Sequence, residues 1–207
     1  MLFLGYDPGG KGTHGVAAVR VARDGALTEL VAVDVVQDAE AAWAWMSDHN
    51  DAAALGIDTL LAWSPRGGRA CDDRLRQAYK AHAPTVIPQN ALYSSMTLNG
   101  AMVARWAART GLPLFESHPK LLVRTRTRLD CITETVIAAY RSIKESSKGS
   151  AALERQADDK ADAVVAAWCA AQGFYGLWPT NLFDAPGEQL EMVAENCRYP
   201  WPDSIVT

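Results

Sequence analysis

The sequence has 207 residues, of which 49% are hydrophobic and 21% are charged, and its formal net charge is −4. This composition is typical of a globular protein with a full hydrophobic core, and it excludes a disordered or fibrous chain. The net negative charge argues against a protein that coats nucleic acid through a broad basic surface, but it is compatible with a local basic surface. We therefore expect a single domain over residues 1–207.

Membrane contact and secretion are both disfavoured by the sequence. No apolar stretch approaches the roughly 20 residues that span a bilayer, and the N-terminus lacks the basic segment of a signal peptide. The four cysteines are widely spaced and include no C-x-x-C pair. Because this spacing favours reduced thiols, we expect a cytoplasmic protein without membrane contact.

The first 36 residues predict an antiparallel meander of three strands. These strands are expected at residues 2–7, 16–21 and 28–36, where apolar and β-branched residues prevail. Asp24 and Gly25 form a strong hairpin signal between the second and third strands. Proline and glycine fill the loop at residues 8–13, so the first strand must end at Asp7. Asp7 is therefore expected at the rim of the sheet, where a ligand or a metal ion can reach it.

The rest of the chain alternates helices with two further strands. Helices are expected at residues 39–49, 70–82, 97–110, 132–144 and 158–172, and strands at residues 53–58 and 112–117. Arg124, Arg126 and Arg128 occupy alternate positions, and they share one face if the chain is extended there. The tail at residues 173–207, which contains Trp and Pro, is expected to be irregular and to pack on the domain.

Acidic residues stand where strands end and on the last predicted helix. Asp7, Asp58 and Glu116 close strands, and Asp159 and Asp162 are three residues apart on one helix face. Clustered carboxylates repel one another and attract hard divalent cations, so this set predicts a site for Mg²⁺ or Mn²⁺. Two such ions about 4 Å apart hold the attacking and the leaving oxygen in phosphoryl transfer.

Each of these residues also has a structural interpretation. Asp58 can begin a turn, and Glu116 can pair with a nearby arginine. Asp158, Asp159 and Asp162 can be solvated acids that complement the positive end of a helix dipole. A shared site is favoured because several strand-end acids occur together in this order.

Five short segments together carry a family resemblance. They are Gly5-Tyr6-Asp7, Gly56-Ile57-Asp58, Arg69-x-Cys71-Asp72, Glu116-Ser117-His118-Pro119 and Asp159-Lys160-Ala161-Asp162-Ala163. These segments resemble the RNase H-like superfamily, and within it an uncharacterised family of predicted RNase H-like nucleases that is distantly related to the Holliday-junction resolvase RuvC. The resemblance spans residues 1–172, and its most specific part is the D-x-x-D-A pattern on the last predicted helix.

The resemblance implies an α/β protein with the RNase H-like fold, in which a mixed five-stranded sheet has three antiparallel strands, then two parallel strands, and helices on both faces. It implies that Asp7, Asp58 and Asp162 are metal ligands, with Asp159 as a fourth or accessory ligand. These residues would be catalytic together with Glu116, the acid of the family's E-x-x-P segment. The implied activity is hydrolysis of phosphodiester bonds in nucleic acid by a two-metal mechanism with Mg²⁺ or Mn²⁺. The choice between DNA and RNA is left open, as is a homodimer.

Four further residues are candidates for contact with the substrate. Arg66 and Arg69 follow Asp58 in the rim loop, where a guanidinium group can hold a phosphate bidentately. Lys11 adds a positive charge to the glycine-rich loop. His118 lies close to the expected site and can assist proton transfer or orient a water molecule, and a structural hydrogen bond is the alternative.

Two other functions remain open at this point. The same fold can persist as a binding or scaffold module without an active metal site. The loop Pro8-Gly9-Gly10-Lys11-Gly12 also resembles the phosphate-binding loop of sugar kinases and other actin-like ATPases. Those enzymes pair two copies of the core, whereas 207 residues accommodate one copy, which disfavours a nucleotide-binding phosphotransferase.

Overall fold

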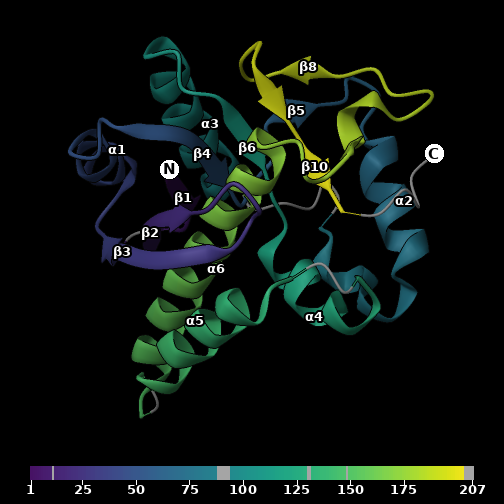
Figure 1. Ribbon diagram of the computed structural model, residues 1–207. Coiled ribbons are helices and arrows are strands. Elements are labelled where there is room, and N and C mark those ends of the chain that lie inside the picture. The colour runs from purple at the N-terminus through teal and green to yellow at the C-terminus, as the bar shows by residue number, and fades with distance from the viewer. Residues whose placement is uncertain (11, 88–93, 130–131, 148, 203–207) are drawn as a thin grey trace.

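A mixed sheet forms the centre of the computed structural model, which describes residues 1–10, 12–87, 94–129, 132–147 and 149–202 (Figure 1). Its strands are β1 (Leu2–Asp7), β2 (His14–Val21), β3 (Leu27–Val36), β4 (Ala52–Ile57), β6 (Leu114–Glu116) and β9 (Cys197–Arg198). They are ordered β3-β2-β1-β4-β6-β9. The β1–β2 and β2–β3 pairs are antiparallel, whereas β4 is parallel to β1 and β6 is parallel to β4. The predicted α/β arrangement of a three-stranded meander followed by two parallel strands is thus confirmed, and β9 makes the sheet six-stranded rather than five-stranded as predicted.

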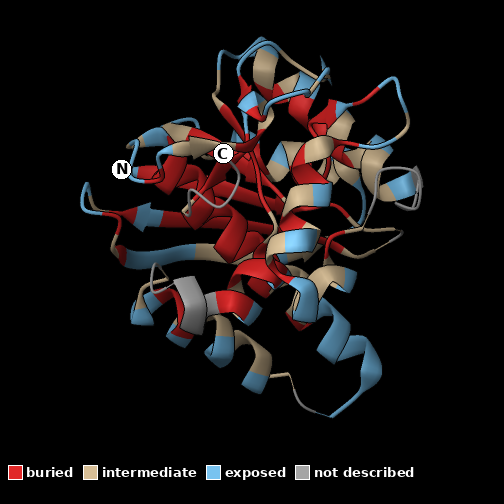
Figure 2. Ribbon diagram, turned by 90° about the vertical axis from the view of Figure 1, so that its right-hand side faces the viewer, coloured by how far each residue is buried: buried red, intermediate tan, exposed pale blue. Residues whose placement is uncertain are grey.

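Helices cover both faces of the sheet. They are α1 (Ala39–Ser47), α2 (Ala70–Ala78), α3 (Ser94–Arg109), α4 (Pro119–Leu129), α5 (Glu134–Glu145) and α6 (Ala151–Phe174), with short 3₁₀ helices η1 (Lys80–Thr85) and η3 (Leu182–Asp184). Successive residues of β1 point to opposite faces. Leu4 and Tyr6 therefore pack in one cluster with side chains of α1 and α3, and Phe3 packs in another with side chains of α6. Figure 2 shows that buried residues fill the inner strands and the inner sides of the helices, whereas β3 at the edge of the sheet is mostly exposed or half-buried.

None of the helices in the described ranges is both long enough and apolar enough to cross a membrane. The longest of them is α6, which has 24 residues. It carries charged side chains in its first half, where Glu154, Asp158 and Asp159 lie.

Residues 119–129 form helix α4, so the extended segment around Arg124 that would place three arginines on one face is not present. Pro119 is the first helical residue, a position where the missing N–H of proline costs no hydrogen bond. Leu121 and Thr125 are both buried, and this helical spacing overrides the alternation of Thr and Arg in the sequence. Positions two apart in a helix point in different directions, so a helical backbone does not favour one shared face for alternate residues.

Helix α6 is longer than the sequence indicated, because it begins at Ala151 rather than at residue 158. Ser150 caps its N-terminus, and the Ser150 hydroxyl oxygen accepts a hydrogen bond from the Leu153 N–H at 3.2 Å. The additional turns place Glu154 on the same helix as Asp158 and the predicted acidic pair.

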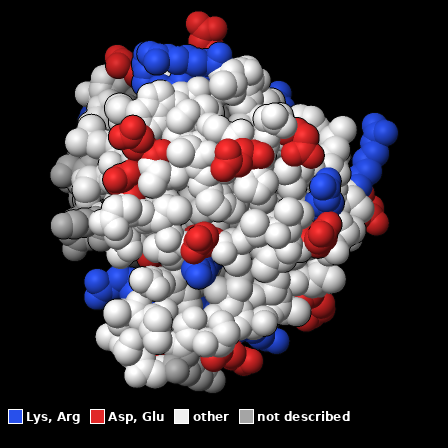
Figure 3. Space-filling view, turned by 90° about the vertical axis from the view of Figure 1, so that its left-hand side faces the viewer, with Lys and Arg blue, Asp and Glu red and all other residues white. Residues whose placement is uncertain are grey.

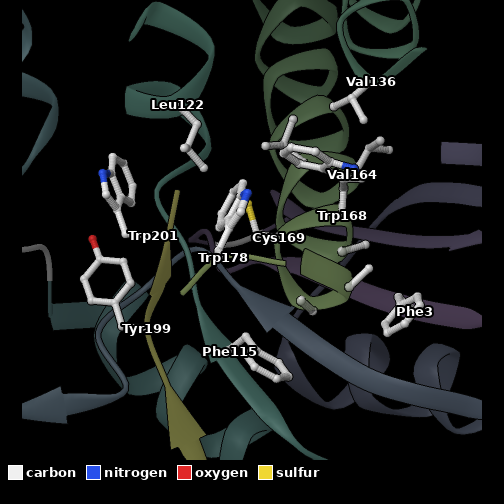
Figure 4. Close-up of a cluster of buried hydrophobic side chains, with 14 of the residues drawn as sticks. Phe3, Phe115, Leu122, Val136, Val164, Trp168, Cys169, Trp178, Tyr199 and Trp201 are labelled. Atoms are coloured by element: carbon white, nitrogen blue, oxygen red, sulfur yellow. The ribbon is translucent and has the colours of Figure 1, made fainter. Parts of the chain in front are cut away.

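The C-terminal tail is more regular and more buried than expected. Its strand β9 adds to the sheet beyond β6, β10 (Pro200–Trp201) pairs with β7 (Thr180–Asn181), and β8 (Glu191–Met192) pairs with β5 (Ala62–Trp63). Tyr199 and Trp201 are fully buried and lie side by side in the core (Figure 4). The indole N–H of Trp201 donates a hydrogen bond to the Tyr79 hydroxyl at 3.1 Å. These aromatic side chains are therefore part of the core on the α6 side of the sheet.

Candidate active site

Two strands carry the same short pattern, a glycine followed two residues later by an aspartate. Gly5 and Asp7 lie on β1, and Gly56 lies on β4 with Asp58 directly after the strand. The two glycines are partners in the parallel β1–β4 register. Residues two apart share one face of a strand, so each aspartate faces the same side as its glycine.

The two glycines allow α6 to approach the sheet closely. A Cβ atom at Gly5 would lie 1.9 Å from the backbone oxygen of Ala163, and a Cβ atom at Gly56 would lie 1.9 Å from that of Ala166. A side chain at either position would therefore push the helix away from the sheet. Because Asp162 directly precedes Ala163, the close approach brings this residue against the ends of β1 and β4.

Asp7, Asp58 and Asp162 meet at this edge of the sheet, and we call them the aspartate trio. One carboxylate oxygen of each lies within 4.8 Å of those of the other two. Asp7 is 4% exposed and Asp162 is fully buried, whereas the Asp58 side chain is 15% exposed. The structure thus brings these three predicted residues together, with Asp58 on the side of the solvent.

Burial and mutual repulsion disfavour the fully ionised trio. Burial raises the pKa of Asp7 well above its ordinary value, and the charges of Asp58 and Asp162 raise it further. Burial also raises the pKa of Asp162 to about 7, although the nearby Lys120 ammonium group opposes this effect. A cation between the three carboxylates would relieve both burial and repulsion.

The buried oxygens of Asp162 are only partly satisfied by the described residues. Its Oδ2 forms an ion pair with Lys120 Nζ at 3.0 Å, and its Oδ1 accepts no hydrogen bond from any of them. Buried carboxylate oxygens are normally hydrogen-bonded or bound to a cation. Three clustered carboxylates with a free buried oxygen are the ligands that Mg²⁺ and Mn²⁺ prefer, so these residues fit such an ion.

Asp159 lies on the same helix but outside the trio. Burial raises its pKa to about 6, although the Lys120 ammonium group opposes this effect. Its Oδ2 is buried and accepts no hydrogen bond within the described part of the chain. Its charge also raises the pKa of Asp7, so Asp159 acts electrostatically on the trio without being part of it.

Glu116 belongs to a separate cluster with Arg69 and Asp72, which we call the arginine cluster. Nη2 of Arg69 lies 2.6 Å from Glu116 Oε1 and 2.6 Å from Asp72 Oδ1. Nη1 of Arg69 donates to Glu116 Oε2 at 2.9 Å, and its Nε donates to Asp72 Oδ2 at 2.8 Å. The backbone N–H of Leu61 donates another hydrogen bond to Glu116 Oε2 at 2.7 Å. The structure thus gives Glu116 the alternative interpretation, a carboxylate that pairs with an arginine.

The structure also gives Arg69 a different part from the predicted contact with a phosphate. Its side chain has no exposed surface, and its guanidinium group is occupied by two carboxylates because a buried charge requires close partners of opposite charge. Arg66 is exposed in the rim loop, and its contact with a substrate phosphate stays a prediction. Lys11 lies outside the described residues.

His118 lies between the trio and the arginine cluster. Its Nδ1 is 3.8 Å from Asp58 Oδ1, and its ring packs edge-on against Tyr199. Burial lowers the pKa of His118, but the hydrogen bond and charge of Asp58 raise it more, so the net shift is upward. Its buried Nε2 has no hydrogen-bond partner among the described residues. His118 is thus placed to orient Asp58, and contact with a substrate stays a prediction.

Sequence reasoning missed two residues near the trio. Lys120 pairs with Asp162, and its position in the first turn of α4, directly after Pro119, was the available signal. Tyr140 lies on α5, and its pKa is raised to about 12 by burial and then by the charge of Asp162. Nothing in the sequence distinguishes Tyr140 from an ordinary aromatic residue of an amphipathic helix.

Comparisons with known proteins give one structural match. No protein-family model matches the sequence, and no curated protein matches it. Among solved structures, the chain is similar to RuvC of Thermus thermophilus, with a TM-score of 0.45 and 19% sequence identity over 87% of this chain and 98% of that chain.

Proposed function

We propose that this protein is a divalent-metal-dependent nuclease that hydrolyses phosphodiester bonds of nucleic acid. The observation that carries this proposal is the aspartate trio, in which buried carboxylate oxygens lie within 4.8 Å of one another. The order of the sheet supports it, because β1 and β4 are neighbours and their ends bring Asp7 and Asp58 to one edge.

In this proposal the trio holds Mg²⁺ or Mn²⁺, and Asp159 is an accessory ligand. A pair of such ions, when bound, stabilises the charge that develops on the attacking and leaving oxygens of an in-line displacement. Three carboxylates from β1, β4 and α6 are held by packed secondary structure, so they are oriented before the substrate binds. Glu116 has no direct part in this chemistry, because Arg69 occupies both of its oxygens.

Lys120 and His118 are the groups of the chain that would act beside the trio. The Lys120 side chain is 50% exposed while its ammonium group reaches the buried Asp162, so it can turn to a substrate phosphate when a metal ion takes its place. His118 Nδ1 lies 3.8 Å from Asp58 Oδ1, so His118 can orient Asp58 by its charge when it is protonated. A cavity of about 80 Å³ lies against Asp58, His118 and Lys120, and the apolar side chains of Met96 and Leu121 on its wall limit water there.

Thermal unfolding with and without Mg²⁺ or Mn²⁺ provides the first test of this function. We expect each ion to raise the Tm of the wild-type protein, because an ion that binds only the folded state stabilises it by about 2.7 kcal/mol at a hundredfold excess over Kd. Asp7→Asn should abolish this shift. The matched control is Asp51→Asn, which changes an exposed aspartate just before the start of β4, at the other end of the sheet.

The same preparations are then assayed for cleavage of labelled single-stranded and duplex DNA and RNA. Metal-dependent cleavage by the wild-type protein that Asp7→Asn removes is the expected result. A thermal shift without cleavage of any of these substrates would instead indicate a metal-binding module without nuclease activity. A shift that requires ATP together with Mg²⁺ would indicate the phosphotransferase. The absence of both shift and cleavage would contradict the proposal.

A further inference from the structure

Charge is distributed very unevenly along the chain. Residues 24–65 contain eight Asp and Glu residues and no Lys or Arg. This segment forms β3, α1 and β4, and Figure 3 shows the face of the molecule on the α1 and β3 side. Acidic side chains are spread across the middle of that face, and most basic side chains lie toward its margins. A polyanion such as nucleic acid is therefore repelled from this face.

Basic side chains lie instead on the helices next to the trio. Lys120 and Arg124 belong to α4, and Arg141 and Lys144 belong to α5. Arg124 and Arg141 are exposed. The charges of Lys120 and Arg124 both act on Tyr140, as does the charge of Asp162, so the α5 aromatic ring lies within electrostatic reach of the trio.

A cleft of about 450 Å³ separates α5 from the first half of α6. Its lining side chains are Tyr140, Arg141, Lys144, Glu145, Glu154 and Asp158. Glu154 and Asp158 precede Asp162 on α6 at intervals of four residues, so all three share one helix face. One wall of the cleft therefore leads along α6 to the trio, and each step of four residues covers about 6 Å along the helix axis.

The chemistry of this cleft suits a nucleotide better than a phosphate alone. Tyr140 packs against the core on one side and also lines the cleft, and an aromatic ring provides a surface on which a base can stack. Arg141 and Lys144 can face a backbone phosphate, although Lys144 forms an ion pair with Asp158. Carboxylates repel phosphates, but they accept hydrogen bonds from the exocyclic amino group of a base.

We propose that the cleft between α5 and α6 is a nucleotide subsite for the residue that flanks the cleaved phosphate, with specificity for an unpaired base that carries an exocyclic amino group. Tyr140 stacks on the base, Glu154 accepts from its amino group, and Arg141 contacts the backbone. This inference rests on the proposed nuclease function, because the trio defines which phosphate is cleaved.

Binding is measured by fluorescence anisotropy with short labelled single strands of equal length, oligodeoxycytidylate or oligothymidylate, in Ca²⁺ buffer. We expect oligodeoxycytidylate to bind more tightly, because cytosine has the amino group and thymine lacks it. Tyr140→Ala should weaken binding by roughly five- to a hundredfold, as the loss of one base–aromatic stack does. Tyr140→Phe should retain it.

Three comparisons prevent a folding defect from being mistaken for a loss of binding. Arg141→Ala changes an exposed side chain and should also weaken both oligonucleotides. Glu154→Ala removes the acceptor, so it should lower the ratio of the oligodeoxycytidylate affinity to the oligothymidylate affinity. Phe174→Ala removes an aromatic residue that is 39% exposed at the opposite end of α6, and it should leave both affinities at the wild-type level.

Unchanged affinity in both Tyr140→Ala and Arg141→Ala would overturn the subsite, and equal affinity for the two oligonucleotides would overturn its base specificity. These failures are distinguishable from failure of the nuclease proposal. Anisotropy needs no cleavage, so a protein that binds through Tyr140 but never cleaves refutes only the nuclease. Normal cleavage by the Tyr140→Ala variant would refute only the subsite proposal.

Discussion

The aspartate trio and the arginine cluster are two groups of buried acids at the same edge of one sheet, and they differ in how their charge is balanced. Three possible ligand atoms lie within 4.8 Å of one another in each place, namely those of the trio and those of Asp72 and Glu116 together with the neighbouring His118. Geometry alone would therefore suggest two metal sites.

The two groups differ in how much positive charge the protein supplies to their carboxylates. In the arginine cluster, the Arg69 guanidinium group donates to both oxygens of Glu116 and to both oxygens of Asp72. In the trio, a half-exposed Lys120 reaches one oxygen of Asp162. The comparison teaches that a buried acid with its partner built in is a structural element, whereas an acid with a free buried oxygen is a place for a cation.

The largest expected effect comes from removing the partner in the arginine cluster. Arg69→Ala leaves two buried carboxylates without a counter-charge, so the free energy of unfolding should fall by about 3–5 kcal/mol. Urea unfolding measures this change. The control is Arg66→Ala, an exposed arginine three residues earlier, whose effect should stay within about 0.5 kcal/mol. If Arg69→Ala lowered the free energy of unfolding no more than Arg66→Ala does, the proposed difference between the arginine cluster and the trio would be contradicted.

The stability of the metal-free protein should fall as the pH rises. Asp162 has a pKa of about 7 in the folded protein against 3.8 ordinarily, so the folded state binds more protons than the unfolded state between these values. Unfolding free energy should therefore decrease by a few kcal/mol from about pH 4 to about pH 7. His118, with its raised pKa, acts in the same direction.

Chemical unfolding at several pH values in a chelator measures this dependence. Asp162→Asn should flatten part of it, since the raised pKa of Asp7 contributes as well, and should stabilise the metal-free protein near neutral pH. Excess Mg²⁺ should counteract the fall, because it binds the ionised carboxylates. Metal-free stability that rises between pH 4 and pH 7 would mean that the trio is not held under repulsion.

Substitution of Gly5 tests whether close approach of α6 creates the trio. The Cβ of Gly5→Ala would collide with the backbone of Ala163, so stability should fall by about 1–3 kcal/mol. The metal-induced rise in Tm should shrink as well, because Asp162 moves with the helix. Gly68→Ala is the matched control, since a Cβ there meets nothing within 4 Å. Equal Tm shifts by metal in both variants would show that the trio does not depend on this contact.

Lys120→Met should have the smallest effect on stability, because the Lys120 side chain is 50% exposed and the buried Asp162, whose pKa is about 7, can take up a proton instead of keeping an unpaired charge. Its informative effect is on ligand binding. Without the ammonium group, Asp162 is free for a metal ion, so Mn²⁺ titrated by calorimetry should bind more tightly while cleavage becomes slower. Lys160→Met, which removes a lysine paired with Asp34 on β3 instead, should change neither. Weaker Mn²⁺ binding by the Lys120→Met variant would contradict the idea that the Lys120 ammonium group and the metal ion compete for Asp162.

Much of the trio was predictable because its determinants are local. Gly5-Tyr6-Asp7 and Gly56-Ile57-Asp58 each place an aspartate where a strand stops, and the D-x-x-D-A pattern indicated the helix that meets them. The sequence alone indicates two apolar strands that each end in Asp, because this pattern requires no tertiary information. The antiparallel meander followed from the turn signals and the strand patterns, whereas the order of the whole sheet was implied by the family resemblance.

The partner of each acid was not predictable in the same way. Arg69 and Glu116 are 47 residues apart, and nothing in the sequence indicates that the arginine would turn inward rather than toward a phosphate. Leu121 and Thr125 are buried by tertiary packing, which made α4 a helix and placed Lys120 beside Asp162. Local sequence determines where a strand ends, whereas packing between distant segments determines which charged group pairs with each acid.

The most direct test of this account is the location of Mn²⁺ by anomalous scattering in crystals of the protein soaked in that ion. The account predicts an anomalous peak about 2.2 Å from carboxylate oxygens of Asp7, Asp58 and Asp162, and none beside Asp72 and Glu116. A peak in the arginine cluster, or crystals in which the trio remains paired with Lys120 at saturating Mn²⁺, would contradict it.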